Sequence, residues 1–135
     1  MSEYLFTYGT LQPGMAPQEI AAAVNKLKPI GEGFLHGTLY DLGEFPGAVL
    51  DPRSAQRISG MVFQLSDDPN VLQQLDDYEE FDPTAPEESL FVRMLHLVEL
   101  SSGQSIPCWI YVYNRRPEGS RILKDGRFQR KQLAS

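Results

Sequence analysis

Short hydrophobic runs separated by glycine, proline and polar residues dominate the chain, which is the pattern of a strand-rich protein. Residues 3–8 (EYLFTY) are rich in aromatic and β-branched side chains, and residues 106–113 (IPCWIYVY) have the strongest β-character. Both segments are therefore predicted to be strands. Further strands are predicted over residues 31–42, 58–65 and 90–100, with a short apolar run at 48–50 that follows a Pro-Gly turn.

Two segments have helical patterns instead. Residues 17–26 (PQEIAAAVNK) begin with proline and contain three alanines, and residues 71–79 (VLQQLDDYE) follow a Ser-Asp-Asp-Pro sequence that is typical of a helix start. Val71, Leu75 and Tyr78 share one side of the second helix, as a core-facing stripe requires. Six or seven strands and two helices without regular β-α-β alternation predict an α+β fold with a closed or nearly closed sheet.

Composition supports a single domain over residues 1–135. The chain is 41% hydrophobic, which is enough for a core at this length. Neither an internal repeat nor a linker is visible. After Asn114 the sequence becomes polar and basic, and we expect about residues 115–135 to form a loosely held tail.

The net charge and the cysteine content limit the possible binding partners of the protein and its possible cellular compartment. The net charge of −6, from 18 acidic and 12 basic residues, argues against a nucleic-acid partner because phosphates require cationic cover. No segment approaches the ~20 apolar residues of a membrane span. The N-terminal sequence does not resemble a secretory signal. A single cysteine, Cys108, suits a reducing compartment, so we expect a cytoplasmic location.

The first strand leads into a glycine turn with an unusual composition. Gly9, Thr10 and Leu11 place a threonine and a leucine where a simple reversal of the chain would be polar. A strand that runs into such a loop is one way to aim backbone N–H groups at a ligand. The loop also has the glycine spacing of a P-loop. Because Met15 and Ala16 replace the lysine and the hydroxyl residue of that motif, no nucleotide site is predicted.

Four acids gather at the end of the second helix: Asp76, Asp77, Glu79 and Glu80. Asp77 and Glu80 point away from the apolar stripe, whereas Glu79 lies four residues after Leu75 and borders the face that packs inward. A carboxylate in that position is paired with a base, hydrogen-bonded, or raised in pKa. The residues leave two interpretations open: Glu79 pairs with a basic residue at the helix end, or it is a half-buried general base in a pocket.

Four motifs occur in a recognisable order. Together they resemble the gamma-glutamylcyclotransferase-like family over roughly residues 4 to 113. The motifs are YGTLQPG (residues 8–14), LYDLGEFPG (39–47), LDDYEE (75–80) and FVR (91–93), the last before a strand that ends in YVY.

The resemblance implies a mixed β-barrel of about six strands with flanking short helices and a cavity between the first loop and the acidic helix end. It implies that Tyr8, Gly9, Thr10 and Leu11 form the substrate-binding loop and that Glu79 is the catalytic acid/base. The implied enzyme binds a small gamma-glutamyl compound and releases 5-oxoproline and a free amine. It is expected to need no cofactor and no metal.

The sequence departs from the family pattern in three places. Glu80 stands where the family often has glycine. Residues 12–16 (QPGMA) replace a loop that often carries a basic residue and an asparagine, and Thr10 stands where glutathione-specific relatives have serine. The acid at Glu80 bears on the electrostatic potential of the site and on substrate preference, and the changed loop bears on the leaving group. Thr10 makes the chain less similar to the glutathione-specific branch.

Two alternatives to this enzyme remain open. The same fold can serve as a non-enzymatic module that binds a small ligand or a protein, or as an enzyme for another ring-closing amide cleavage. Retention of Glu79 favours an enzyme. The experiment that separates these readings is a screen of gamma-glutamyl compounds for release of 5-oxoproline.

Other reactive residues carry less information. Cys108 lies within an apolar strand and is predicted to be an inert buried thiol, not a nucleophile with a histidine base. His36 and His96 lack the spacing of metal ligands. The strand that contains Tyr111 and Tyr113 presents its aromatic residues on one face, and either tyrosine is a candidate for the pocket wall.

Overall fold

The computed structural model describes residues 3–9, 16–42, 46–115, 119–123 and 126 of the 135. All strands and helices that were predicted from the sequence are present, although their first and last residues differ from the predicted ones. In chain order the elements are β1 (Tyr4–Thr7), α1 (Gln18–Val24), β2 (Lys28–Asp41), β3 (Pro46–Leu50), β4 (Arg57–Gln64), α2 (Pro69–Tyr78), the 3₁₀ turn η1 (Pro86–Glu88), β5 (Phe91–Leu100), β6 (Ser105–Tyr113) and β7 (Arg121–Ile122).

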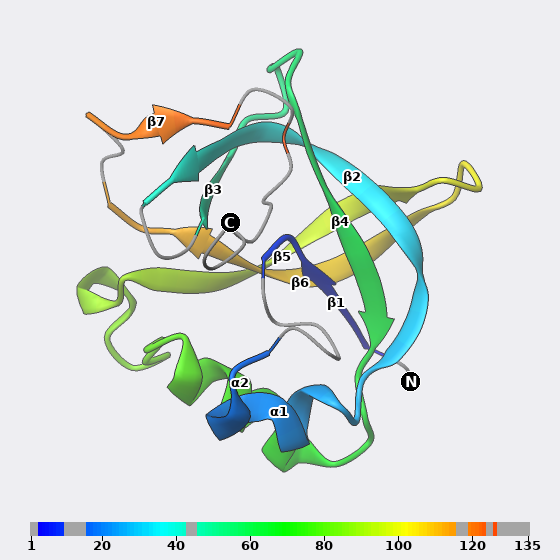
Figure 1. The fold of residues 1–135 in the computed structure, drawn as a ribbon, viewed down its shortest axis with the longest axis vertical. Helices are drawn as coiled ribbons and strands as arrows, with labels where there is room; N and C mark the ends of the chain where they lie inside the picture. The colour runs from blue at the N-terminus through cyan, green and yellow to red at the C-terminus, as the bar shows by residue number, and fades with distance from the viewer. Residues whose placement is uncertain (1–2, 10–15, 43–45, 116–118, 124–125, 127–135) are drawn as a thin grey trace, which may run out of the picture.

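The strands form one sheet that closes on itself. Its order is β3-β2-β4-β1-β6-β5, and β2 also pairs with β5, so that β2, β4, β1, β6 and β5 make a closed barrel (Figure 1). All pairs are antiparallel except β1 with β6, which run parallel with Leu5 opposite Trp109. The predicted α+β fold with a mixed β-barrel and short flanking helices is therefore confirmed.

Closure depends on the long, bent strand β2. It begins at Lys28, before the predicted start at residue 31, because a register irregularity between Pro29 and Gly31 lets it continue along β4. Near Gly33 the strand also pairs with β5. A Cβ at Gly33 would lie 2.8 Å from a methyl carbon of Val98 on β5, so this strand crossing requires glycine.

Two hydrophobic clusters lie on opposite sides of the sheet. Neighbouring residues of β1 illustrate this, because Leu5 packs with the residues of α1 and α2 while Phe6 packs among the inward-facing residues of the barrel. The helices lie on the same side of the barrel (Figure 1) and cover the first cluster. In the described part of the chain, no helix has the length and apolar character needed to cross a membrane.

The segment after β6 differs from the prediction of a loosely held tail. β7 pairs with β2, with Ile122 opposite Tyr40, and the backbone N–H of Leu123 donates to the Leu39 carbonyl at 2.8 Å. Gly126 accepts a hydrogen bond from the Ser59 N–H at 2.9 Å. Backbone pairing therefore fixes part of this polar segment to the sheet. The final residues, 127–135, lie outside the described part of the chain.

Candidate active site

A cavity of about 290 Å³ opens between the barrel and the C-terminal end of α2. Its walls come from the end of β1 and the following loop, the start of β3, the end of α2, the start of β5, and β6. Tyr8, Gly9 and Glu79 all line it, so the structure brings these predicted site residues together. Thr10 and Leu11 lie outside the described residues.

Glu79 reaches the cavity from the C-cap position of α2. It is half-buried, and desolvation raises the pKa of its carboxyl group to about 7. The described residues provide no hydrogen-bond donor or basic partner for its side chain. Near neutral pH both protonation states are thus populated, which is the property of an efficient general acid/base.

Glu80 adopts a conformation that favours glycine. Its φ is +57°, and it follows the C-cap of α2. The N–H of Phe81 donates to the Asp76 carbonyl at 2.9 Å and the N–H of Glu80 to the Asp77 carbonyl at 3.2 Å, which is the Schellman pattern. Glu80 is exposed, as its helical phase predicted, but it also lies on the cavity wall.

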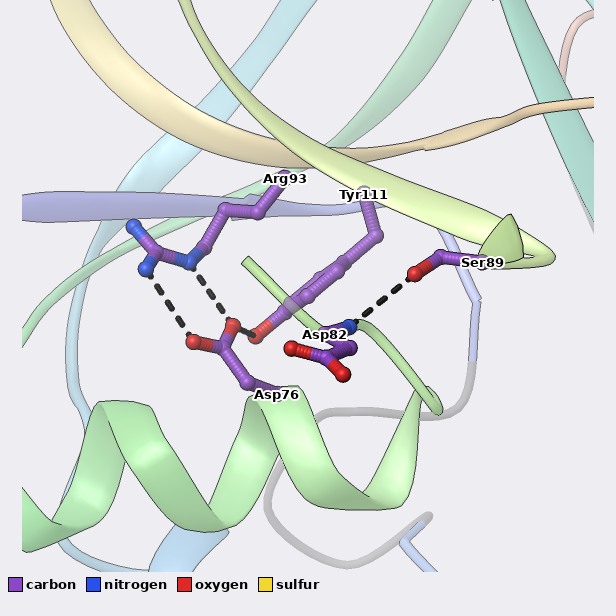
Figure 2. Close-up of polar contacts among 5 residues, drawn as sticks. All are labelled: Asp76, Asp82, Ser89, Arg93 and Tyr111. Atoms are coloured by element: carbon purple, nitrogen blue, oxygen red, sulfur yellow. Dashed lines mark hydrogen bonds and ion pairs between the residues drawn. The ribbon is translucent and has the colours of Figure 1, made fainter. Parts of the chain in front are cut away.

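Asp76 was one of the four acids noted at the end of the second helix, but the sequence analysis assigned it no role. It is buried, and Figure 2 shows its carboxylate directed toward Arg93 of β5 and Tyr111 of β6. Arg93 Nε donates to Asp76 Oδ1 at 2.7 Å and Arg93 Nη2 to Oδ2 at 3.1 Å, while the Tyr111 hydroxyl donates to Oδ1 at 2.7 Å. The signal that was available is Arg93 itself, since an arginine inside an apolar strand needs an acidic partner.

This network holds one wall of the cavity. Of the two β6 tyrosines that were candidates for the pocket wall, Tyr111 is the one that lines the cavity. Burial and the bond to Asp76 raise the pKa of the Tyr111 hydroxyl, so it stays protonated as a donor. The Arg93 guanidinium also stacks 4.3 Å from the centre of the Trp109 ring. The Asp76 carboxylate consequently has a structural role, because both of its oxygens accept hydrogen bonds within this network.

Tyr8 connects three strands at the base of the cavity. Its hydroxyl donates to the Tyr111 carbonyl and accepts from the Ala48 N–H at 3.4 Å. Burial, and secondarily the nearby Glu79, raises the pKa of its hydroxyl above the ordinary tyrosine value. The adjacent Gly9 packs closely on β3, because a Cβ there would lie 3.3 Å from the Pro46 ring. The first two residues of the predicted loop are therefore held by hydrogen bonds and by packing on β3.

The connection from α2 to β5 is also fixed. The Asp82 N–H donates to Ser89 Oγ at 3.0 Å (Figure 2), and Asp82 Oδ1 accepts from the Thr84 N–H at 2.9 Å. The Asn114 amide donates to the Ser89 carbonyl at 3.0 Å. These bonds position the start of β5, where Phe91 forms part of the cavity wall.

The remaining candidates lie elsewhere. Cys108 is completely buried within the barrel, and burial raises the pKa of its thiol to about 12. His36 and His96 do not line the Glu79 cavity. Within the described ranges, no three His, Cys, Asp or Glu side chains are grouped to hold a metal ion.

Comparison with known proteins identifies the family. Residues 5–130 match the family described as gamma-glutamyl cyclotransferase, AIG2-like. No curated protein matches the chain significantly.

Solved structures share the fold at low sequence identity. An AIG2-like protein from Mus musculus is 22% identical, with a TM-score of 0.67 over 87% of this chain and 81% of that one. YtfP from Escherichia coli is also 22% identical, with a TM-score of 0.64 over 93% and 95%. YkqA from Bacillus subtilis is 20% identical with a TM-score of 0.69, and the match covers 95% of this chain but 40% of YkqA. Since the family match spans nearly the whole sequence, the chain belongs to the gamma-glutamyl cyclotransferase, AIG2-like family.

Proposed function

We propose that this protein is a gamma-glutamylcyclotransferase-type enzyme that converts a gamma-glutamyl amide into 5-oxoproline and a free amine. The observation that carries the proposal is Glu79, a half-buried carboxylate with a pKa raised to about 7, in a cavity that the first loop also lines. Family membership supports the same chemistry.

The substrate carries its own nucleophile in this reaction. Its α-amine attacks the γ-carbonyl carbon, a C–N bond forms to close a five-membered ring, and the C–N bond to the leaving amine breaks. An α-amino group has a pKa of about 8 and is mostly an ammonium near pH 7, without a lone pair for attack. Glu79 accepts that ammonium proton and then donates it to the departing nitrogen. As the lactam forms, the ring nitrogen loses a second proton, which passes to Glu79 and then to the freed amine, so that the amine leaves as an ammonium and Glu79 is again a carboxylate.

Glu79 is better suited to this role than Asp76. The Asp76 carboxylate is bound to Arg93 and Tyr111, and moving a proton to it would weaken both interactions. The pKa of Glu79 lies near that of the ammonium, so proton transfer in either direction costs little free energy.

Binding contributes through orientation. Ring closure is intramolecular, and a substrate held in a folded conformation reacts with a much smaller entropic cost. Backbone N–H groups of the loop that begins at Gly9 would bind the α-carboxylate or the developing oxyanion. The reaction as written needs neither a metal ion nor an organic cofactor.

The test is the identity of the product. Purified protein is incubated with gamma-glutamyl amides whose leaving amines are an α-amino acid, a lysine side chain and a polyamine, and mass spectrometry follows 5-oxoproline. Donors with an N-acetylated α-amine should not react, because an amide nitrogen is a poor nucleophile. The β-aspartyl analogues should also fail, because closure would give a strained four-membered ring.

Other results would assign a different function. Glutamate as the direct product, or turnover of the acetylated donor, would mean hydrolysis by water. Binding of the donors without turnover would identify a binding module on the same fold.

A further inference from the structure

Thr7 is the last residue of β1, and the environment of its side chain is unusual for a residue with only a structural role. It is 4% exposed, and it lies on the cavity wall together with Glu79. Its hydroxyl oxygen is buried and finds no hydrogen-bond partner within the part of the chain that the structure describes. The following residue, Tyr8, shows the usual situation, since its buried hydroxyl both donates and accepts.

A buried hydroxyl without a partner is unfavourable for folding. Protein interiors leave few such groups, and each one destabilises the native state by the cost of removing it from water. Valine has almost the same shape as threonine and would fill the same space without that cost. An unpaired polar group on the wall of a binding cavity therefore indicates a partner that arrives with the ligand.

We propose that Thr7 is a substrate-binding residue whose hydroxyl forms a hydrogen bond with the glutamyl part of a gamma-glutamyl substrate, an inference that rests on the proposed function. The hydroxyl oxygen is itself inaccessible to solvent, so contact with a substrate requires a rotation about χ1 to another staggered position, which brings the hydroxyl to the cavity. The hydroxyl can donate to the α-carboxylate or γ-carbonyl, or accept from the α-amine.

The cavity wall contains both a buried and an exposed residue, and this difference suggests how the proposed substrate is oriented. Thr7 is buried, whereas Glu80, also on the wall, is exposed to solvent. A substrate with its constant glutamyl part inside and its variable amine outside places the first against Thr7 and the second near Glu80. Loss of the Thr7 hydroxyl should consequently weaken every donor by a similar factor, whatever its leaving amine.

The experiment compares Thr7→Val and Thr7→Ser with the wild type. We measure kcat/KM for donors with neutral and cationic leaving amines, binding of 5-oxoproline by calorimetry, and the Tm of each free protein. For Thr7→Val we expect kcat/KM to fall about tenfold for all donors, as the loss of one hydrogen bond to substrate implies, with a similar loss of 5-oxoproline affinity. Its Tm should rise by about 4 °C, because the unpaired hydroxyl is gone.

Thr7→Ser keeps the hydroxyl and should retain kcat/KM within about threefold. A matched control is Thr38→Val on β2, outside the cavity, where the Thr38 hydroxyl donates to the Gln56 side chain at 3.0 Å. That variant should leave kcat/KM unchanged and should not raise the Tm.

Several results would overturn the inference. Unchanged kcat/KM in Thr7→Val would mean that the hydroxyl does not contact substrate, and a lower Tm or failure to fold would mean that it has a structural role. A loss confined to one leaving amine would place Thr7 at the other end of the substrate. If the wild type turns over no donor, the proposed function fails and this inference fails with it, whereas an active wild type with an equally active Thr7→Val rejects this inference alone.

Discussion

Asp76 and Glu79 lie one helical turn apart at the end of α2, and their carboxylates have opposite surroundings. Asp76 is fully partnered by Arg93 and Tyr111, while Glu79 faces a cavity and has no such partner among the described residues. Desolvation raises the pKa of Glu79. The more deeply buried Asp76 carboxylate is instead paired with a cation and accepts a hydrogen bond from a hydroxyl. Hydrogen bonding thus separates a structural acid from a chemically available one.

The largest expected effect is the loss of activity on substitution of Glu79, the carboxylate without a partner among the described residues. Glu79→Gln keeps the shape of the side chain but cannot accept the ammonium proton, so kcat should fall by about 10²–10⁴-fold. Release of 5-oxoproline is the measurement, and Asp77→Asn is the control because Asp77 is exposed and outside the cavity. Equal losses in both variants would show that the comparison has selected the wrong acid.

The second prediction concerns the structural acid. Asp76→Asn leaves the partly buried Arg93 charge without its counter-ion, and the free energy of unfolding should fall by about 3 kcal/mol. Urea unfolding measures this loss. The exposed pair of Lys26 and Asp68 provides a contrast, because Lys26→Met should leave stability almost unchanged. A small effect of Asp76→Asn would remove the distinction between the two carboxylates.

The third prediction uses pH. The pKa of Glu79 is raised from 4.5 to about 7, so the folded state binds this proton more tightly than the unfolded state. The contribution of Glu79 to stability is therefore favourable below about pH 4.5, is lost as the pH rises to about 7, and is constant above that. Glu79→Gln should match the wild type near pH 4 and become more stable by up to about 3 kcal/mol at pH 8.

Thermal or urea unfolding of both proteins across this pH range measures the difference. A difference that does not change with pH would mean that Glu79 has an ordinary pKa, and its environment would then resemble that of an exposed acid.

The smallest expected effect concerns Glu80. Its φ of +57° costs a residue with a Cβ about 1 kcal/mol relative to glycine, so Glu80→Gly should raise the free energy of unfolding by about that amount. Asp77→Gly is the matched control, since Asp77 lies within the helix and glycine there should destabilise it slightly. Equal changes in both variants would exclude backbone strain at Glu80.

The elements that local pattern determines were predictable. Strand runs such as residues 58–65 depend on composition. The start of α2 follows from the Ser-Asp-Asp-Pro sequence, in which Asp68, one of three candidate caps, is the N-cap and Pro69 lies in the first turn. The position of Glu79 followed from helical phase, because phase depends only on sequence spacing.

Contacts between distant segments were not predictable in the same way. The partner of Asp76 depends on β5 and β6 passing over α2, and the pairing of Tyr40 with Ile122 depends on the path of the chain after β6. Register and closure come from three-dimensional packing, which residue spacing does not specify. The polar composition of residues 115–123 therefore gave no sign of β7.

The parallel pairing of β1 with β6 has a consequence for folding. Leu5 lies opposite Trp109, and β6 also supplies Tyr111 to the cavity and to Asp76, so the first strand finds its second neighbour only after most of the chain is available. Contacts this distant in sequence form slowly, because a long loop must be ordered first. A nascent chain that ends before residue 105 therefore has α2 and Glu79 but lacks β6, which closes the barrel and supplies Tyr111 to the cavity wall. The cavity at Glu79 is therefore completed only in a late step of folding, when the sheet closes.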